Sequence, residues 1–155
     1  MQPLNNMELS HLTPQGKLRM VDVGGKPPMA RKAVASGRIM MQAQTIQKIS
    51  DGSIIKGDLL AAAEIAGIMA AKKCADLIPL CHPLPIDQVE IRTTLLPDGV
   101  EVHACVRCIG VTGVEMEALT AVSIALLTLY DMCKAVDKQM VIEGITLIEK
   151  SKEKL

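Results

Sequence analysis

The feature that most constrains this sequence is a run of alternating apolar and polar residues between Val89 and Cys108. Alternation with a period of two places one set of side chains on a buried face of a strand. The run is interrupted only by Pro97-Asp98-Gly99, which favours a tight turn. The segment therefore predicts a β-hairpin with one buried face.

Other patterns supply the remaining elements of a domain. Residues 59–74 are rich in alanine and follow Asp58, a suitable helix N-cap, while Pro79, Pro83 and Pro85 exclude a helix from the next loop. The expected elements are a strand over 31–41, a short helix near 45–50, a helix over 59–74, the hairpin, a long helix over 115–136 and a strand over 140–148.

The order of these elements predicts an α+β fold of the ferredoxin-like βαββαβ type, a four-stranded antiparallel sheet with two helices on one face. The other face of the sheet is left open and little chain remains to cover it, so we expect an oligomer. We expect a single domain over residues 20–150, a flexible N-terminal tail over 1–19 and a short C-terminal tail over 151–155.

Composition excludes several classes of partner. Lysine plus arginine equals aspartate plus glutamate at 17 each, so the chain has no bulk basic surface for nucleic acid. Tyr130 is the one aromatic residue, which leaves no stacking platform for bases. The longest uncharged helical stretch, 118–130, is shorter than the roughly 20 residues that cross a membrane. Five cysteines without a signal peptide indicate reduced thiols, and we expect a soluble, cytoplasmic protein.

The long helix carries the strongest functional signal. Its middle is apolar almost all round, yet Asp131 and Lys134 follow at a spacing that places them on one helical face. One interpretation is a partly buried ion pair near the helix end. The other is a carboxylate and an ammonium group held away from water with shifted pKa values, suited to proton transfer.

Two further groups of charged residues lie near predicted helix starts. Thr112-Gly113-Val114-Glu115 matches a capping box, which explains Glu115 structurally, whereas Glu117 has no such explanation. Lys56 precedes the helix at 59, where a cation opposes the helix dipole but suits a phosphate site. A solvated loop lysine is the alternative.

Cysteines suggest two other hypotheses. Cys81-His82 lies in a proline-fixed loop and is a candidate site, although adjacent side chains in an extended loop usually diverge. Cys105 and Cys108 have the spacing of a metal motif but fall in an alternating strand, where they point to opposite faces. We therefore predict no metal site; a zinc-binding protein is a competing hypothesis that a metal assay tests.

Taken together, several segments resemble one family closely over residues 20–150. The segments are Met20-Val21-Asp22-Val23, Lys56-Gly57-Asp58, Asp76-Leu77-Ile78-Pro79-Leu80-Cys81-His82-Pro83-Leu84, Thr112-Gly113-Val114-Glu115-Met116-Glu117-Ala118-Leu119-Thr120-Ala121 and Tyr130-Asp131-Met132-Cys133-Lys134-Ala135-Val136. They resemble the family of molybdenum cofactor biosynthesis protein C, the cyclic pyranopterin monophosphate synthase.

The resemblance implies a reaction and an assembly. The family converts (8S)-3′,8-cyclo-7,8-dihydroguanosine 5′-triphosphate, a cyclised dihydro-GTP, to cyclic pyranopterin monophosphate and diphosphate. It implies a lyase without a redox cofactor, with Mg²⁺ on the substrate phosphates left open. It also implies a homohexamer, a trimer of dimers, with active sites at subunit interfaces.

The resemblance also implies roles for individual residues. Asp131 matches the catalytic aspartate, and Lys134 and Lys56 match the essential lysines. Burial is expected to lower the pKa of Lys134 so that it serves as general acid. Residues matching the substrate-binding positions are Leu80, Cys81, His82, Glu115, Met116 and Glu117, with Arg31 and Lys150 near the triphosphate.

The sequence departs from the family pattern at two places. Val111 stands where the family usually has lysine, which removes one cation, and residues 151–155 differ from the usual Ser-Gly-Gly-Lys-Ser-Gly tail. Lys152 and Lys154 are candidates to compensate. The competing hypothesis is an impaired ferredoxin-like module that binds the precursor without turning it over; the intact set of Lys56, Asp131 and Lys134 argues against it.

Overall fold

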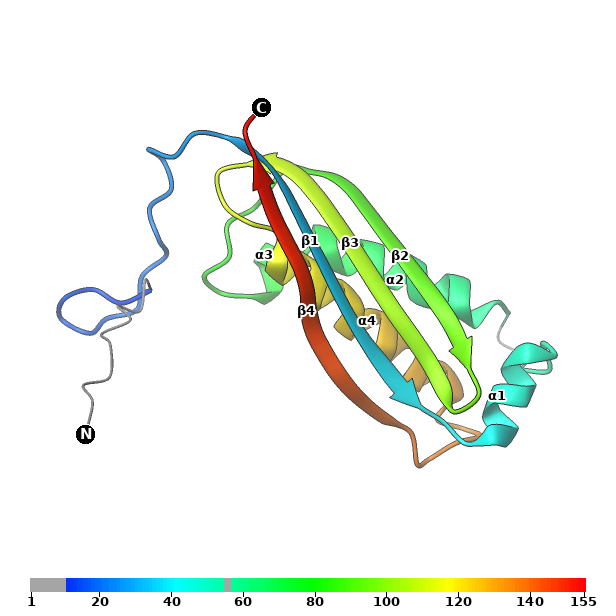
Figure 1. The fold of residues 1–155 in the computed structure, drawn as a ribbon. Coiled ribbons are helices and arrows are strands. Elements are labelled where there is room, and N and C mark those ends of the chain that lie inside the picture. Colours follow the sequence, from blue (N-terminus) through cyan, green and yellow to red (C-terminus); the bar gives the residue numbers. More distant parts are fainter. Residues whose placement is uncertain (1–10, 55–56) are drawn as a thin grey trace, which may run out of the picture.

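A computed structural model describes residues 11–54 and 57–155 and contains one antiparallel sheet of order β2-β3-β1-β4 (Figure 1). Helices α2 and α4 cover one face of this sheet. The predicted ferredoxin-like order is confirmed, with the predicted short helix α1 after the first strand and one further turn, α3. The elements are β1 Met29–Met40, α1 Ala43–Ser50, α2 Leu59–Lys72, α3 Cys74–Leu77, β2 Ile86–Leu96, β3 Gly99–Gly110, α4 Glu115–Cys133 and β4 Val141–Glu153.

The predicted hairpin is confirmed as β2 and β3. Val102 and Val106 of β3 are fully buried, and Ile91 of β2 pairs with Ala104. Pro97 and Asp98 form the two-residue link, since Leu96 already pairs with Gly99. Gly99 has to be glycine because a Cβ there would collide with the backbone of the end of β1.

α2 and α4 run antiparallel to each other, so each end of the domain holds the start of one helix and the end of the other. β1 ends beside the start of β3, because Met40 pairs with Gly99. α2 therefore begins near the end where α4 finishes, while α4 begins at the opposite end, after Gly110. The helices approach closely at Gly67, where a Cβ would lie 3.1 Å from the carbonyl oxygen of Ala121.

α4 is the central helix of the core. Ala118, Val122, Leu126 and Leu129 are fully buried against the sheet and α2. By length and composition α4 is the one helix among the described residues that could cross a membrane, but half of that stretch is buried inside the domain. Its apolar character is accounted for by its place in the core.

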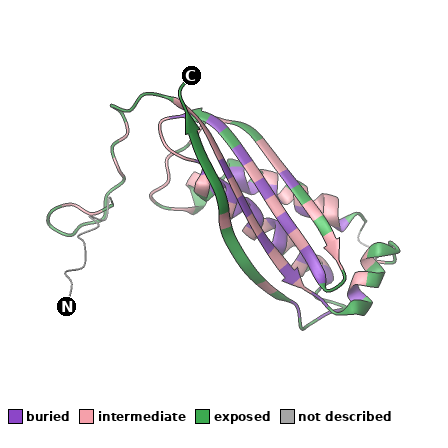
Figure 2. Cartoon of the chain, in the orientation of Figure 1, coloured by how far each residue is buried: buried purple, intermediate pink, exposed green. Residues whose placement is uncertain are grey.

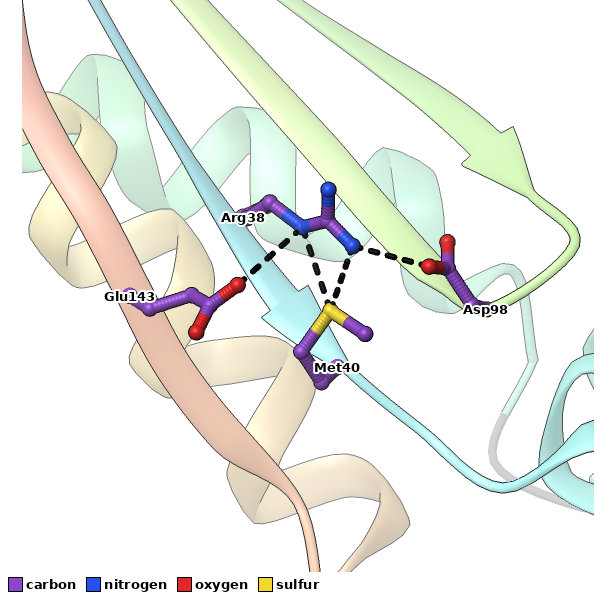
Figure 3. Close-up of polar contacts among 4 residues, drawn as sticks. All are labelled: Arg38, Met40, Asp98 and Glu143. Atoms are coloured by element: carbon purple, nitrogen blue, oxygen red, sulfur yellow. Dashed lines mark hydrogen bonds and ion pairs between the residues drawn. The ribbon is translucent and has the colours of Figure 1, made fainter.

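The second face of the sheet is open and charged. Arg38 of β1 pairs with Asp98 in the hairpin turn at 2.9 Å and with Glu143 of β4 at 3.5 Å (Figure 3). Lys32 pairs with Glu149 across β1 and β4 at 2.9 Å. This face therefore presents charged side chains that pair within one protomer, and the oligomer stays a prediction.

The last strand is longer than expected. β4 runs to Glu153, beyond the expected end at Ile148. The extension was not predicted because residues 149–153 carry charged or polar side chains on both faces, so no apolar alternation marks them as a strand. Figure 2 shows β4 exposed over most of its length, whereas buried residues gather in β1, β3 and the helices. Residues 1–10 of the predicted tail lie outside the described residues; Leu12 and Leu18 form an isolated bridge.

Candidate active site

The predicted substrate-binding residues gather around a cavity of about 330 Å³ at the start of α4, here called the α4 pocket. Its walls come from the loop before β2, the loop before α4, the first turn of α4 and the segment preceding β1. It contains six of the predicted residues. The lining residues are His11, Val21, Val23, Lys26, Leu80, Cys81, His82, Leu84, Thr112, Gly113, Glu115, Met116 and Glu117.

The loop that carries Cys81 and His82 is fixed by hydrogen bonds as well as by prolines. The N–H of Ile78 donates to the carbonyl of Cys74, and the N–H of Cys81 donates to that of Ile78 at 3.1 Å. Burial, together with the nearby negative charge of Glu117, raises the pKa of the Cys81 thiol. Cys81 is therefore held as a thiol, which disfavours a cysteine nucleophile.

Glu117 is the buried acid of the α4 pocket. Its side chain comes from the first turn of α4, and the residue is 4% exposed. Burial is the main cause that raises the pKa of Glu117, and the charge of Glu115 adds to the effect. Such a carboxyl group gains from a ligand that brings hydrogen-bond donors to it.

Glu115 does not form the predicted capping box. Val114 is the N-cap of α4, and no side chain caps the helix there. Glu115 instead lies over Gly113, where a Cβ would collide with its carboxylate, and pairs with Lys150 at 3.3 Å. The partner from β4 lies 35 positions along the chain, so a local pattern could not reveal it. The Glu115 carboxylate is thus part of the pocket rather than a helix cap.

Cys74 and Thr120 lie close to the α4 pocket, since Cys74 interacts with Glu117 and Cys81, and neither residue was predicted to belong to the site. The Sγ atom of Cys74 lies 3.6 Å from the hydroxyl of Thr120, and both residues are buried. Burial raises the pKa of Cys74 to about 12. Thr120 follows Glu117 by three positions on the same helical face, which is the signal that could have pointed to it.

A second cavity adjoins the first at Gly113 and Glu115 and is here called the β4 pocket. It measures about 350 Å³ and is lined by Arg31, Lys32, Gly113, Glu115, Lys150, Ser151 and Lys152. Arg31 donates from Nε to the carbonyl of Gly110 at 3.4 Å and from Nη2 to that of Val111 at 3.3 Å. The two predicted basic residues, Arg31 and Lys150, are therefore brought together in a cationic pocket.

Asp131 and Lys134 form the predicted ion pair at the other end of α4, with the Nζ and Oδ1 atoms 2.6 Å apart. Their side chains are 66% and 60% exposed, so the expectation that they are held away from water is wrong for a single protomer. The hydrogen bond to Asp131 and its charge raise the pKa of Lys134. The expected net lowering does not occur, because Asp131 raises the pKa of this exposed ammonium group more than desolvation lowers it.

One protomer does not bring this ion pair to the pockets. Glu115 and Asp131 are sixteen positions apart on α4, about 24 Å at 1.5 Å of rise per residue. Lys56 lies outside the described residues. Two positions further along the chain, Asp58 caps α2 by accepting a hydrogen bond from the N–H of Ala61 at 3.0 Å. Asp58 lies at the end of the helix layer where Asp131 lies.

Cys105 and Cys108 lie on opposite faces of β3, as their alternation predicts. Cys108 is buried in the core, whereas Cys105 faces the open side of the sheet. All five cysteines are free, and no group of three or more potential metal ligands occurs in the described part of the chain.

Several known proteins similar to this chain carry the same name. A family model described as the MoaC family matches residues 20–153. A cyclic pyranopterin monophosphate synthase from Chloroflexus aggregans is 59% identical over 145 residues, which cover 92% of this chain and 88% of that protein. Proteins of the same name from Desulfitobacterium hafniense and Novosphingobium aromaticivorans are 53% and 57% identical, over 94% and 92% of this chain and 90% and 91% of their own lengths.

Proposed function

This chain belongs to the MoaC family, and on that premise we propose that Asp131, Lys134 and Lys56 act on a substrate held in the α4 and β4 pockets. The activity is that of a cyclic pyranopterin monophosphate synthase, an enzyme of molybdenum cofactor biosynthesis. The substrate we assign is the cyclised dihydro-GTP, (8S)-3′,8-cyclo-7,8-dihydroguanosine 5′-triphosphate, which yields the cyclic monophosphate and diphosphate.

The observation that carries the proposal is the pairing of an acidic pocket with a basic one. Glu115 and Glu117 offer carboxylate oxygens to the N–H groups on the guanidine-like edge of the base. Arg31 and Lys150 line the adjoining cavity and match the charge of a polyphosphate. The two cavities meet at Gly113, so one elongated molecule with a donor-rich ring and an anionic tail fits both.

The distance along α4 supports a site shared by two protomers. A proton donor has to lie within hydrogen-bond reach of the reacting atoms, which an ion pair about 24 Å from Glu115 does not achieve within one chain. A second protomer brings its own Asp131 and Lys134 to the pockets. We therefore propose a homohexamer, a trimer of dimers, with active sites at subunit interfaces.

Exposed apolar side chains on the helix layer favour such contacts. Ile65 and Met69 on α2 are 59% and 56% exposed one turn apart, and Leu127 on α4 is 52% exposed. These side chains gain by burial against another protomer, unlike the charged open face of the sheet. The helix layer is thus the better candidate for the subunit contact.

The chemistry we propose is proton transfer combined with charge neutralisation. The ring system is opened by water and rebuilt, so protons have to be supplied and removed. Lys134 is the general acid, and Asp131 orients it or takes up a proton. A sugar hydroxyl then attacks the α-phosphorus, the bond to the β-phosphate breaks and diphosphate leaves. Lys56, Arg31 and Lys150 neutralise the leaving charge. We assign no redox cofactor, and a Mg²⁺ ion, where one takes part, would be held by the substrate phosphates.

The intact set of Lys56, Asp131 and Lys134 argues against the competing hypothesis of a binding module without turnover, which Val111 in place of lysine suggests. We place the enzyme in the cytoplasm, acting on a small molecule rather than on nucleic acid or a membrane. The test is diphosphate release from the cyclised precursor by wild type, Lys134→Ala and Asp131→Asn. Both side chains are exposed, so the variants are expected to fold. We expect release from wild type and none from either variant. Tight binding of the precursor by wild type without release would contradict the proposed function.

A further inference from the structure

The carboxyl end of β4 carries a charge arrangement that the fold alone does not explain. Lys152 of β4 lies directly opposite Arg31 of β1 in the antiparallel register, and Lys150 lies opposite Ala33. Directly opposed residues on neighbouring strands place their side chains on the same face, where like charges destabilise the pairing. The strands therefore juxtapose two cations at the rim of the β4 pocket.

The other cations at this end of β1 and β4 have acidic or carbonyl partners, whereas Lys152 has no acidic partner among the described residues. Lys32 pairs with Glu149, and Lys150 pairs with Glu115. Arg31 directs its guanidinium to the carbonyls of Gly110 and Val111. Lys152 makes no ion pair with any residue in the ranges 11–54 and 57–155. An anion placed between Arg31 and Lys152 would relieve the repulsion, since charge-assisted hydrogen bonds are among the strongest available.

The position and charge of the β4 pocket indicate which kind of anion it binds. The β4 pocket shares Gly113 and Glu115 with the α4 pocket, so a ligand in one extends into the other. Four cationic side chains line it against the single carboxylate of Glu115. A multiply charged anion is therefore favoured over a monoanion. A ring attached to such an anion would lie toward the α4 pocket, which Glu117 lines.

We propose that Lys152 is a substrate-binding residue that holds the polyphosphate of the substrate between itself, Arg31 and Lys150. This inference rests on the proposed function for the identity of the ligand. Lys150 exchanges its pairing with Glu115 for the phosphate oxygens, which leaves the Glu115 carboxylate available to the base. Of the two lysines at the end of the chain, the structure selects Lys152, because Lys154 follows the last residue of β4 and does not line the pocket.

The test compares Lys152→Gln with the matched control Lys154→Gln, which removes the same charge from a neighbouring exposed position. Binding of inorganic triphosphate is measured by titration calorimetry, and steady-state diphosphate release gives KM and kcat. For Lys152→Gln we expect the Kd for triphosphate and the KM to rise about tenfold, the typical effect of one charge-assisted hydrogen bond, with kcat little changed. Lys154→Gln is expected to stay within about twofold of wild type, as for an exposed charge without a partner. Lys152→Arg is expected to restore binding.

Equal effects of the two glutamine variants would overturn the assignment of Lys152 and would indicate a general effect of net charge. Unchanged triphosphate binding in Lys152→Gln would overturn it as well. Failure of the proposed function is a separate result: wild type would release no diphosphate from the precursor. A selective loss of triphosphate binding in Lys152→Gln would then still support a polyphosphate site at Lys152.

Discussion

Subunit complementation tests whether the active site is shared between two protomers. One variant, Glu117→Gln, alters the α4 pocket and leaves Asp131 and Lys134 intact. The other, Lys134→Ala, removes the ammonium group about 24 Å away along α4 and leaves the pocket intact. Each variant alone is expected to release little diphosphate, because every site in it carries the same defect.

Mixing the two variants is expected to restore activity. In a twofold dimer with a shared site, one site of a mixed pair receives both defects and the other receives none. Random pairing makes half of the dimers mixed, so about a quarter of the sites are intact and about a quarter of wild-type turnover returns. Co-expression from two tagged copies, followed by two-step purification, isolates the mixed oligomers for the diphosphate assay.

A matched control separates complementation from trivial recovery. Asp131→Asn mixed with Lys134→Ala places both defects at the same end of α4, 2.6 Å apart in the wild-type ion pair. Every site in that mixture keeps one defect, so no activity is expected. Purified mixed oligomers of Glu117→Gln and Lys134→Ala that stay inactive would refute the shared site, and equal recovery in both mixtures would do the same.

Three further predictions concern stability and reactivity. Burial raises the pKa of Glu117 in the folded state, so wild type loses stability as the pH rises from the unfolded-state pKa through the folded-state pKa. Glu117→Gln lacks this titration, so its melting temperature relative to wild type is expected to increase with pH over that range. A difference in melting temperature that stays constant with pH would contradict this. Gly67→Val places a side chain 3.1 Å from the α4 backbone and is expected to cost about 1–3 kcal/mol in chemical denaturation, whereas Gly25→Val, in open space, is expected to be neutral. Cys74, 1% exposed with a pKa of about 12, is expected to resist a thiol reagent at neutral pH that labels the partly exposed Cys105; labelling of the two at equal rates in the native protein would contradict its burial.

The elements of the fold could be predicted where a local pattern is strong. The alternation on both sides of Pro97-Asp98 fixes the hairpin, and Asp58 marks the start of α2 as its side chain caps the helix. The end of β4 was missed because its outermost residues are charged on both faces, so no apolar period marks the strand. Its pairing with β1 is a tertiary property that the sequence does not display locally.

The site was predictable as a set of residues but not as a geometry. The spacing of Asp131 and Lys134 predicts their contact. The exposure of the two side chains depends on what packs over the end of α4, and a spacing along the helix carries no information about that. The capping pattern at Glu115 failed because α4 begins at Glu115 with Val114 as its N-cap, so Thr112 does not occupy the capping position. The Glu115 carboxylate pairs instead with Lys150 from a distant strand. The separation of Glu115 from Asp131 was available from the predicted helix, since sixteen helical positions already imply about 24 Å.

The proposed shared site would also account for the proposed role of Lys134 as a proton donor. In the single protomer Asp131 raises the pKa of Lys134, and an ammonium group whose pKa is raised is a poor acid at neutral pH, where the best donors have a pKa near the ambient pH. Covering the pair with the pocket of a second protomer removes water from the ammonium, and desolvation lowers the pKa of a lysine. In the proposed assembly the cations of the β4 pocket would act in the same direction, because a nearby positive charge disfavours a second one. Both effects would oppose that of Asp131, which in the single protomer outweighs the lowering of the Lys134 pKa by desolvation.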